Sequence, residues 1–208
     1  VRNTIVFQGS ARINEEDEKF KKNGYDRYYT DAYELSKQLT QWSEDTFSER
    51  ETKFYISSGA GPGIMEAANK GAHDAGGKSV GLGIKLPFEQ TNNEYVTPEL
   101  DFVYHYFFTR KYWFMYQAKA LVIFPGGFGT MDELFEALTL IQCQKVKKPV
   151  PTVLYGKDFW ENVIGWNKFI EAGTISKKDL NLFKIVDDVD TAKTFLIEEI
   201  TKYYKLHF

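Results

Sequence analysis

A glycine-rich turn followed by a carboxylate is the feature of this chain that could do chemistry. Residues Phe124-Pro125-Gly126-Gly127-Phe128-Gly129-Thr130-Met131-Asp132-Glu133 lie between an apolar run, 120–124, and an amphipathic stretch, 134–144. A glycine turn between a strand and a helix presents unpaired backbone N–H groups at the positive end of the helix dipole, and both favour an anion such as phosphate. We expect Glu133 in the first turn of that helix, beside the anion. The pattern predicts chemistry on a phosphorylated substrate.

The same residues can also serve the helix itself. Thr130-x-x-Glu133 ahead of an apolar run is a capping box, in which the two side chains bond the free N–H groups of the first turn. An isolated motif of this kind favours the cap. The complete string, however, resembles the Pro-Gly-Gly-x-Gly-Thr-x-x-Glu signature of the LOG (Lonely Guy) family, formerly described as lysine decarboxylase-like, and matches it at every fixed position.

A second block supports the resemblance. Residues 58–72 are similar to the family's Gly-Gly-Gly-Pro-Gly-x-Met-Glu-Ala-Ala-x-x-Gly-Ala block, with Ala60 in place of the middle glycine. A Cβ there would crowd a backbone that needs positive φ. The resemblance places Gly59 and Gly61 at the substrate. Glu66 either faces the cleft or is a solvated acid that complements the helix dipole, and the alanines can equally serve to pack a helix on a sheet.

An Arg-Lys pair precedes the strand that leads into the glycine turn. The family carries such a pair, its arginine is half of the catalytic pair, and Arg110 is the matching position. An arbitrary Arg-Lys dipeptide is a solvated surface stripe. Here residues 104–116 are aromatic on nearly every side, and charges in such a helix are rarely buried unless paired or functional. The resemblance thus implies that Arg110 and Glu133 are catalytic and that Lys111 binds substrate.

Further substrate contacts are implied around this pair. The resemblance assigns the 5′-phosphate to the backbone and hydroxyl groups of the glycine turn, namely Gly126, Gly127, Gly129 and Thr130. Ser10 and Arg12 follow the first expected strand, although a Gly-Ser pair there can be an ordinary strand-exit turn. Glu89 resembles a loop acid of the family and can equally be solvated. Glu136, one turn beyond Glu133, is a second candidate for the acid.

The elements that must position these residues alternate between strand and helix. Strands are predicted at 4–8, 53–57, 79–84, 101–106, 120–124, 150–155 and 183–186. Helices are predicted at 26–47, 63–75, 109–119, 130–144, 159–172 and 191–204. This pattern predicts an α/β fold over residues 1–208 as one domain: a Rossmann-like, doubly wound, mostly parallel sheet with helices on both faces. Ligands of such folds bind at the carboxyl ends of the strands, where these motifs fall.

Composition and charge limit the classes of protein to which this chain could belong. The net charge of −3 over 208 residues gives no general attraction to nucleic acid or to an anionic membrane, and the apolar runs are too short to span a bilayer. Cys143 is the single cysteine, which fits a reducing compartment, and we expect it to be a small core residue. No secretory pattern is visible, so we expect a cytoplasmic protein. The chain begins at Val1 rather than Met, which leaves open whether residues precede it.

The chain lacks the residues that other nucleotide- and cofactor-binding motifs require. A Walker A loop needs Lys and Ser or Thr after its glycines, but Met131 follows Gly129-Thr130. Residues 9–12 lack the glycines of a dinucleotide fingerprint. No lysine lies in a recognisable pyridoxal phosphate site. We expect no cofactor and no metal, because the histidines are scattered, at His73, His105 and His207.

The resemblance covers Ile5 to about Asp188 and implies an enzyme. The expected reaction is hydrolysis of the N-glycosidic bond of a purine nucleoside 5′-monophosphate, AMP or an N6-modified cytokinin nucleotide, to free base and ribose 5-phosphate. Glu133 would stabilise the oxocarbenium-like cation and activate water, and Arg110 would hold the phosphate or the departing base. The alternative is binding without turnover, because molybdenum-cofactor carriers use a similar fold and anion site; a carrier has no need of the Arg110–Glu133 pair.

The aromatic helix also predicts self-association. Phe107, Phe108, Tyr112, Trp113, Phe114, Met115 and Tyr116 place apolar side chains on every face of one short helix. One face can cover the sheet, and the rest would be an exposed aromatic patch. Aromatic residues and Met are enriched in interface cores, and two-fold dimers are the commonest closed assembly. We therefore expect a homodimer.

Overall fold

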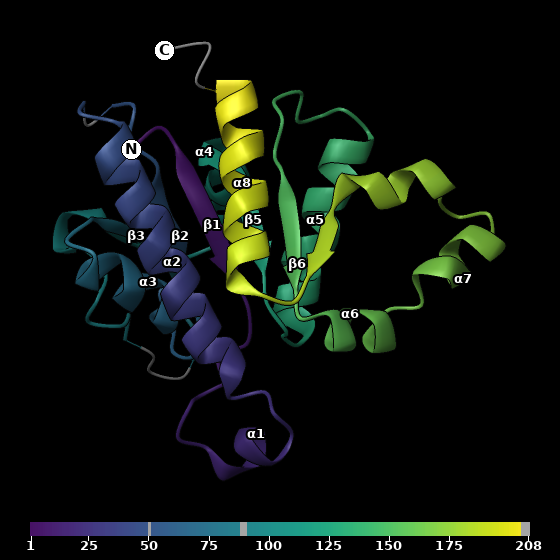
Figure 1. Ribbon diagram of the computed structural model, residues 1–208, viewed down its shortest axis with the longest axis horizontal. Helices are drawn as coiled ribbons and strands as arrows, with labels where there is room; N and C mark the ends of the chain where they lie inside the picture. The colour runs from purple at the N-terminus through teal and green to yellow at the C-terminus, as the bar shows by residue number, and fades with distance from the viewer. Residues whose placement is uncertain (50, 88–90, 205–208) are drawn as a thin grey trace.

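One parallel sheet organises the protein (Figure 1). The computed structural model describes residues 1–49, 51–87 and 91–204. Within these residues, seven strands pair in parallel in the order β4-β3-β2-β1-β5-β6-β7. The strands are β1 (Thr4–Gln8), β2 (Tyr55–Ser58), β3 (Ser79–Ile84), β4 (Asp101–Tyr104), β5 (Ala118–Ile123), β6 (Thr152–Tyr155) and β7 (Lys184–Val186). The predicted α/β class is confirmed.

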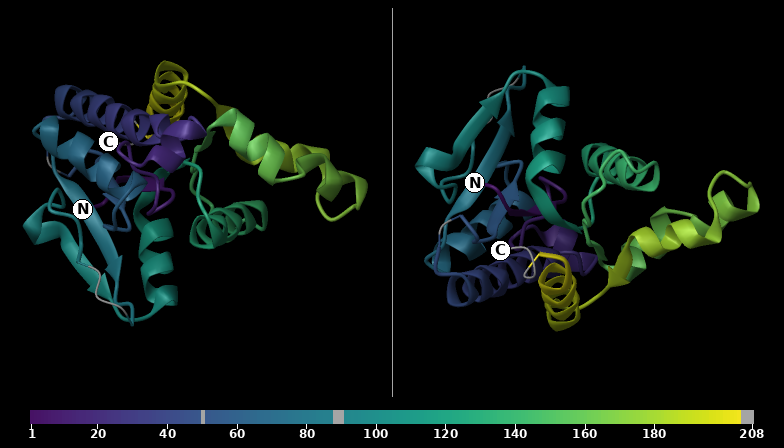
Figure 2. Two further views of the ribbon diagram at one scale, coloured as in Figure 1. Left: turned by 90° about the horizontal axis from the view of Figure 1, so that it is seen from below. Right: turned by 90° about the horizontal axis from the view of Figure 1, so that it is seen from above.

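Helices cover the sheet on both faces. In chain order the helices are α1 (Glu18–Lys22), α2 (Arg27–Thr46), α3 (Ile64–Asp74), α4 (Phe107–Gln117), α5 (Phe128–Gln142), α6 (Lys157–Val163), α7 (Trp166–Glu171) and α8 (Val189–Tyr204), with short 3-10 turns η1 (Pro98–Leu100) and η2 (Lys177–Leu182). Figure 2 shows α2, α3 and α8 on one face and α4 and α5 on the other. Each face has its own apolar core.

The strands form a sheet because they bury both of their faces. All five residues of β1 are buried, and β5 is almost continuously apolar, as expected of parallel strands covered on two sides. On the α2–α8 face, the ring of Phe124 stacks on Tyr155 with centroids 4.5 Å apart. This stack continues to Phe7 at 6.2 Å. The residue that enters the glycine turn is therefore anchored in the core.

The strand order creates a crevice between β1 and β5. From β1 the chain adds β2, β3 and β4 outward on one side, and then crosses back to place β5 on the other side of β1. The loops after β1 and β5 consequently leave the sheet in opposite directions. Ligands of doubly wound folds bind at such a switch point.

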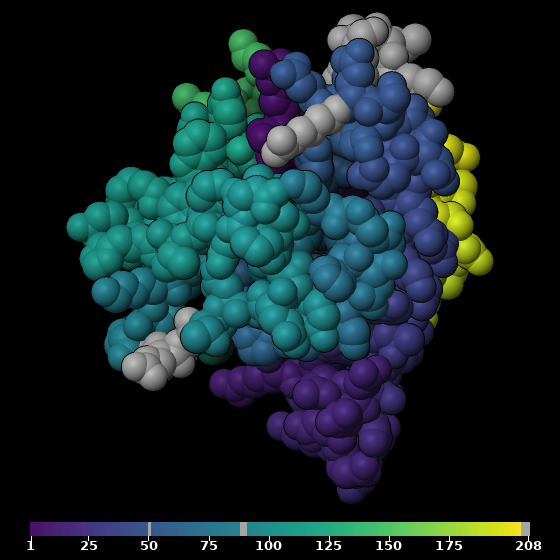
Figure 3. Space-filling view, turned by 90° about the vertical axis from the view of Figure 1, so that its left-hand side faces the viewer, coloured from purple at the N-terminus to yellow at the C-terminus, as the bar shows by residue number. Residues whose placement is uncertain are grey.

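Some local expectations were wrong. The predicted helix 159–172 is two helices, α6 and α7, because Ile164 is extended and buried and Gly165 begins the second helix. Helix α5 begins at Phe128 rather than Thr130. Cys143 is not a core residue: it follows the last turn of α5 and is exposed. Helix α1 was not predicted, and it projects beyond the body (Figures 1 and 3).

Helix α4 leaves most of its aromatic side chains in solvent. Only Phe114 and Met115 of this helix are buried. The aromatic patch comprises Tyr106, Phe107, Phe108, Tyr112, Trp113 and Tyr116. Phe102 and Val103 of β4 are exposed as well, but as successive strand residues they point to opposite faces of the sheet. The chain does not bury this helix by itself, which is the condition on which the dimer prediction depends.

Candidate active site

The glycine turn joins β5 to α5 without any side-chain cap. Gly127 is the residue before the helix, and among the described residues no side-chain hydrogen bond caps this end of α5. The first N–H groups of the helix are therefore available to a ligand, at the positive end of the helix dipole. A Cβ built on Gly127 or Gly129 would meet no atom within 4 Å, so both lie beside open space, whereas a Cβ on Gly126 would lie 2.1 Å from the Thr130 hydroxyl oxygen. The glycine turn therefore faces open space at Gly127 and Gly129 and packs against Thr130 at Gly126.

The capping-box prediction is wrong. Because α5 begins at Phe128, Thr130 is its third residue and Glu133 its sixth, and the first turn holds no acid. Glu133 is thus free of a capping role and lies in the second turn.

Glu133 meets Arg110 across the cleft-facing sides of α5 and α4. Their charged atoms, Arg110 Nη2 and Glu133 Oε1, are 3.6 Å apart, and the two side chains are only 14% and 10% exposed. The Arg110 guanidinium carbon also lies 5.1 Å from the ring centre of Phe107 and 5.7 Å from that of Phe114. The Arg110 Nε is buried and has no hydrogen-bond partner in the described structure. A partly satisfied, buried ion pair of this kind is a candidate for chemistry rather than for stability.

Burial dominates the ionisation of this pair. It raises the pKa of Glu133 from 4.5 to about 7, although Arg110 and then Lys111 act in the opposite direction. Burial also lowers the pKa of Arg110, against the pull of Glu133 and Asp132. A carboxyl group that titrates near neutral pH can exist as a base and as an acid under working conditions.

Two further loops are tied to the glycine turn. The backbone N–H of Ser10, after β1, donates to the carbonyl of Pro125 at 3.0 Å, and the Ser10 carbonyl accepts from the N–H of Ile64 at 3.1 Å. Gly63 has φ of 69°, and a Cβ there would lie 2.4 Å from the Ser10 carbonyl oxygen. Only glycine permits this approach. The Ser10 hydroxyl accepts from the N–H of Arg12 at 3.1 Å.

These loops enclose a cleft of about 680 Å³ at the carboxyl ends of the strands. It is lined by Gln8, Gly9, Ser10, Ala11, Arg12, Gly59, Met65, Ile84, Leu86, Asn92, Phe107, Arg110, Gly126, Gly127, Phe128, Gly129, Thr130, Met131, Glu133 and Val163. The predicted site residues that the fold brings together here are Ser10, Arg12, Gly59, Arg110, Gly126, Gly127, Gly129, Thr130 and Glu133. The cleft places an anion cradle, an acid and an arginine within one cavity of ligand size.

Four predicted site residues are not brought to this cleft. Lys111 is ion-paired to Asp132 and Glu136. Glu66 accepts a hydrogen bond from the Tyr29 hydroxyl at 2.9 Å. The Gly61 carbonyl accepts from the Asn93 side chain at 3.1 Å. None of these three lines the cleft, and neither does Glu136. Glu89 lies outside the described residues.

Sequence reasoning missed one wall of the cleft. Ile84, Leu86, Asn92 and Phe107 line it from the β3–β4 side. A signal for Asn92 exists in β3, where Gly83 has no side chain and a Cβ there would lie 2.4 Å from the Asn92 amide oxygen. Gly83 indicates that a loop packs closely on β3, but it does not identify which residue of that loop makes the contact. Val163, from α6, carries no sequence signal.

Ala60 has the strained conformation that its sequence context predicts. Its φ is 60°, a left-handed value that is uncommon for a residue with a Cβ. Hydrogen bonds hold it: its N–H donates to the Ser58 hydroxyl at 3.0 Å, and its carbonyl accepts from the backbone N–H of Asn93 at 2.8 Å. The turn next to Gly59 is therefore fixed despite the substitution of alanine for glycine.

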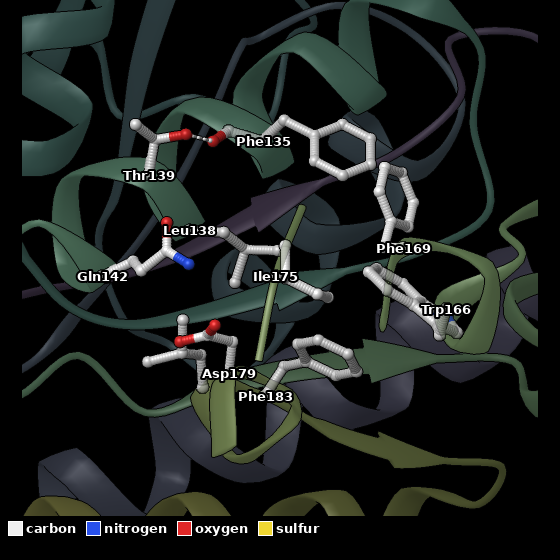
Figure 4. Close-up of a pocket in the computed structure, with 10 residues that line it drawn as sticks. Phe135, Leu138, Thr139, Gln142, Trp166, Phe169, Ile175, Asp179 and Phe183 are labelled. Atoms are coloured by element: carbon white, nitrogen blue, oxygen red, sulfur yellow. Dashed lines mark hydrogen bonds between the residues drawn. The ribbon is translucent and has the colours of Figure 1, made fainter. Parts of the chain in front are cut away.

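A smaller hollow lies between α5 and the arm formed by α7 and η2 (Figure 4). Its volume is about 120 Å³, and its walls are mainly the apolar side chains of Phe135, Leu138, Trp166, Phe169, Ile175, Leu182 and Phe183. The Thr139 hydroxyl at its rim is occupied, since it donates to the Phe135 carbonyl at 2.7 Å. Asp179 is engaged by the Ser176 N–H and hydroxyl. No lysine, arginine or histidine is among the described residues that line this hollow, so it lacks the cations that favour a phosphorylated substrate.

Two negative findings concern the described part of the chain. No helix there is long and apolar enough to cross a membrane. In the same residues, no three His, Cys, Asp or Glu side chains gather where they could hold a metal ion.

The fold and the cleft define a doubly wound α/β protein with an uncapped glycine turn at its switch point. The chain belongs to the LOG family, since residues 65–196 match the family model described as possible lysine decarboxylase. It is 28% identical over 201 residues, 95% of this chain and 77% of the relative, to a probable cytokinin riboside 5′-monophosphate phosphoribohydrolase of Oryza sativa subsp. japonica. It is 27% identical over 155 residues, 73% of this chain and 68% of the relative, to a cytokinin riboside 5′-monophosphate phosphoribohydrolase of Arabidopsis thaliana.

Solved structures share the fold. The molybdenum cofactor binding protein of Rippkaea orientalis superposes with a TM-score of 0.63 at 17% identity, covering 97% of this chain and 99% of that one. The molybdenum cofactor carrier protein of Chlamydomonas reinhardtii gives 0.61 at 20% identity, with the same coverage. At these identities the likeness concerns the fold alone.

Proposed function

We propose that the protein hydrolyses the N-glycosidic bond of a purine nucleoside 5′-monophosphate, AMP or an N6-modified AMP, to the free base and ribose 5-phosphate. The observation that carries the proposal is the buried Arg110–Glu133 pair, 3.6 Å apart, inside the cleft that holds the glycine turn. The names of the rice and Arabidopsis relatives point to the same reaction.

The 5′-phosphate is bound by the glycine turn. Its oxygens accept from the uncapped N–H groups at the start of α5 and from the Thr130 hydroxyl. Arg12, at the exit of β1, faces the same cavity. The bound phosphate fixes the ribose at the second turn of α5, where Glu133 lies. Binding energy from the phosphate, which does not react, thereby orients the bond that breaks.

Glu133 acts on the sugar. Cleavage of the bond between C1′ and the purine nitrogen leaves an oxocarbenium-like cation, which the ionised carboxylate stabilises in a shielded cavity. The same carboxylate removes a proton from the water whose oxygen bonds to C1′. Arg110 binds the phosphate or hydrogen-bonds the departing base, and the base takes up one proton as it leaves. With a pKa of about 7 for Glu133, kcat/KM should rise with pH up to about neutrality.

The second candidate function is binding without turnover, with which the fold shared with molybdenum cofactor proteins is compatible. The two candidates differ in what Glu133 must do. A carrier needs the glycine turn but gains nothing from a carboxylate whose charge opposes that of a phosphate.

The deciding experiment is incubation with AMP and with an N6-prenylated AMP, followed by chromatographic assay of free base and ribose 5-phosphate. We expect Glu133→Gln to lower turnover by about two to four decades. Glu198→Gln, an exposed acid on α8 at the other face of the sheet, is the control and should keep full activity. Tight nucleotide binding with no released base, or full turnover by folded Glu133→Gln, would refute the proposal.

A further inference from the structure

Five charged side chains bridge α4 and α5 beside the cleft. Consecutive residues on α4, Arg110 and Lys111, face Asp132, Glu133 and Glu136 on α5. The Lys111 Nζ lies 2.7 Å from an Asp132 oxygen and 2.6 Å from a Glu136 oxygen. These contacts are about 1 Å shorter than the Arg110–Glu133 contact next to them. The tightest link between the two helices therefore lies outside the cleft, next to Arg110 on α4 and one and three residues from Glu133 on α5.

Lys111 reaches its partners across an open groove. The groove, of about 470 Å³, runs between the helices and is also lined by Phe128, Met131 and Leu140. The Lys111 side chain is only 14% exposed, whereas those of Asp132 and Glu136 are 58% and 32% exposed. Burial by itself lowers the pKa of Lys111, but the contacts with the two acids outweigh it and raise the pKa above its usual value. Lys111 therefore keeps its charge and is engaged by this chain's own carboxylates.

The geometry of the contacts fixes α5 in two ways. Asp132 and Glu136 are four residues apart and lie on the same side of the helix, on successive turns. One ammonium group that binds both sets the distance between the helices and also the rotation of α5 about its axis. Glu133 follows Asp132 directly, so the rotation of α5 determines where its carboxylate points.

We propose that Lys111 is a positioning residue, which clamps α5 to α4 through Asp132 and Glu136 and so holds Glu133 against Arg110 in the cleft. The proposal rests on the proposed function for its effect on turnover, but not for its effect on Glu133 itself. It replaces the sequence-based expectation that Lys111 binds substrate.

The charges of this cluster also act on Glu133. After burial, the groups that set its pKa are Arg110 and Lys111, which lower it, and Glu136 and Asp132, which raise it. Arg12 faces the same cleft from the loop after β1. Removal of Lys111 leaves two unneutralised acids beside Glu133. Removal of the two acids leaves an unneutralised lysine. Both changes break the contacts between Lys111 and its two acids, but they act on the pKa of Glu133 in opposite directions.

That opposition defines the experiment. Lys111→Met, Lys111→Arg, the double variant Asp132→Asn/Glu136→Gln and the control Glu198→Gln are compared by the pH profiles of kcat and KM for AMP. The Glu133 carboxyl is titrated separately by carbon NMR, with its signal assigned from Glu133→Gln. If Lys111 positions Glu133, both clamp-breaking variants lose about 10- to 100-fold in the plateau kcat, because a displacement of about 1 Å has that effect. Lys111→Arg recovers most of the loss.

The Glu133 titration should move in opposite directions in the two clamp-breaking variants. We expect it to shift up by about one pH unit in Lys111→Met and down in the double variant. A purely electrostatic role would reproduce these shifts with unchanged plateau kcat and would overturn the clamp. A raised KM in Lys111→Met, with a fully active double variant, would show that Lys111 binds phosphate directly and would also overturn it.

Failure of the proposed function is distinguishable from failure of the clamp. If the wild-type protein releases no base from any nucleotide, the function fails, and the carboxyl titration still tests the cluster. An unshifted Glu133 titration in both variants then overturns the clamp. If Lys111→Met does not fold, the double variant decides alone, since a wild-type plateau kcat in that variant refutes the positioning role.

Discussion

Replacement of Glu133 by glutamine should stabilise the protein at neutral and alkaline pH. Burial raises the pKa of Glu133 to about 7 in the folded chain, against 4.5 when it is solvated. The folded state therefore binds this proton more tightly than the unfolded state. The stability that comes from the protonated carboxyl is fully present below pH 4.5 and is lost as the pH rises to about 7.

The size of the stabilisation follows from the shift in the pKa of Glu133. A rise of this pKa from 4.5 to about 7 corresponds to about 3 kcal/mol of unfolding free energy. Glutamine has nearly the shape of the neutral acid and leaves Arg110 equally unpaired, so the two proteins should have similar stability near pH 4.5. At pH 8.5 the variant should be more stable by about 3 kcal/mol, with a steepest slope of about 1.4 kcal/mol per pH unit between these limits. The absence of a capping role for Glu133 means that no lost cap offsets the gain.

Urea denaturation at intervals from pH 4.5 to 8.5 measures this difference without adding salt. Glu198→Gln is the control, because an exposed carboxylate is hydrated in both states and should give no change of this size. A flat difference between wild type and Glu133→Gln would show that Glu133 ionises as a solvated acid. A wild type that gains stability with pH would show that its attraction to Arg110 outweighs burial. Either result would refute the electrostatic account of the site.

Three other outcomes are expected. Arg110→Ala should abolish most nucleotide turnover and Arg110→Lys should recover only part of kcat/KM, because a point charge lacks the planar fork; equal values in all three proteins would place Arg110 outside the reaction. Gly63→Ala should destabilise the protein more than Gly76→Ala: both residues have positive φ, which costs about 1–2 kcal/mol with a Cβ, but only at Gly63 does the Cβ strike backbone. We also expect a homodimer at micromolar concentration, assembled through the aromatic patch, with Trp113→Glu weakening both association and activity; light scattering that finds a fully active monomer would contradict this.

The sequence predicted the fold, and it predicted several residues that line the cleft, because both depend on local patterns. Buried parallel strands are continuous apolar runs, and the glycine turn must follow one of them. The sequence could not locate the start of α5, because glycines before a helix permit several starting points. Nor could it identify Asn92 and Val163, which reach the cleft from separate loops through long-range packing.

The position of Lys111 depends on the geometry of the α-helix that carries the Arg-Lys pair. Successive residues of an α-helix are about 100° apart around its axis. Two consecutive side chains therefore point in different directions, although both can line a wide cleft, as Thr130 and Met131 of α5 do. Arg110 faces Glu133, and Lys111 points in another direction, to Asp132 and Glu136. The adjacent Arg110 and Lys111 thus have different partners, one inside the cleft and two outside it.

Several local costs of this fold lie at the cleft. Ala60 is held in a left-handed conformation beside the cleft-lining Gly59. Arg110 buries an Nε without a partner, and Glu133 is shielded enough to resist ionisation. The β1–β5 core beneath is mostly buried and apolar, but it has costs of its own: the buried Thr4 hydroxyl has no hydrogen-bond partner among the described residues, and the β1–β5 register shifts between Thr4 and Ile5. Strain and desolvation persist only where the surrounding structure over-determines them. Here the hydrogen bonds at Ala60 and the ion pairs of Lys111 supply that constraint, which is why we expect their loss to lower activity before it unfolds the protein.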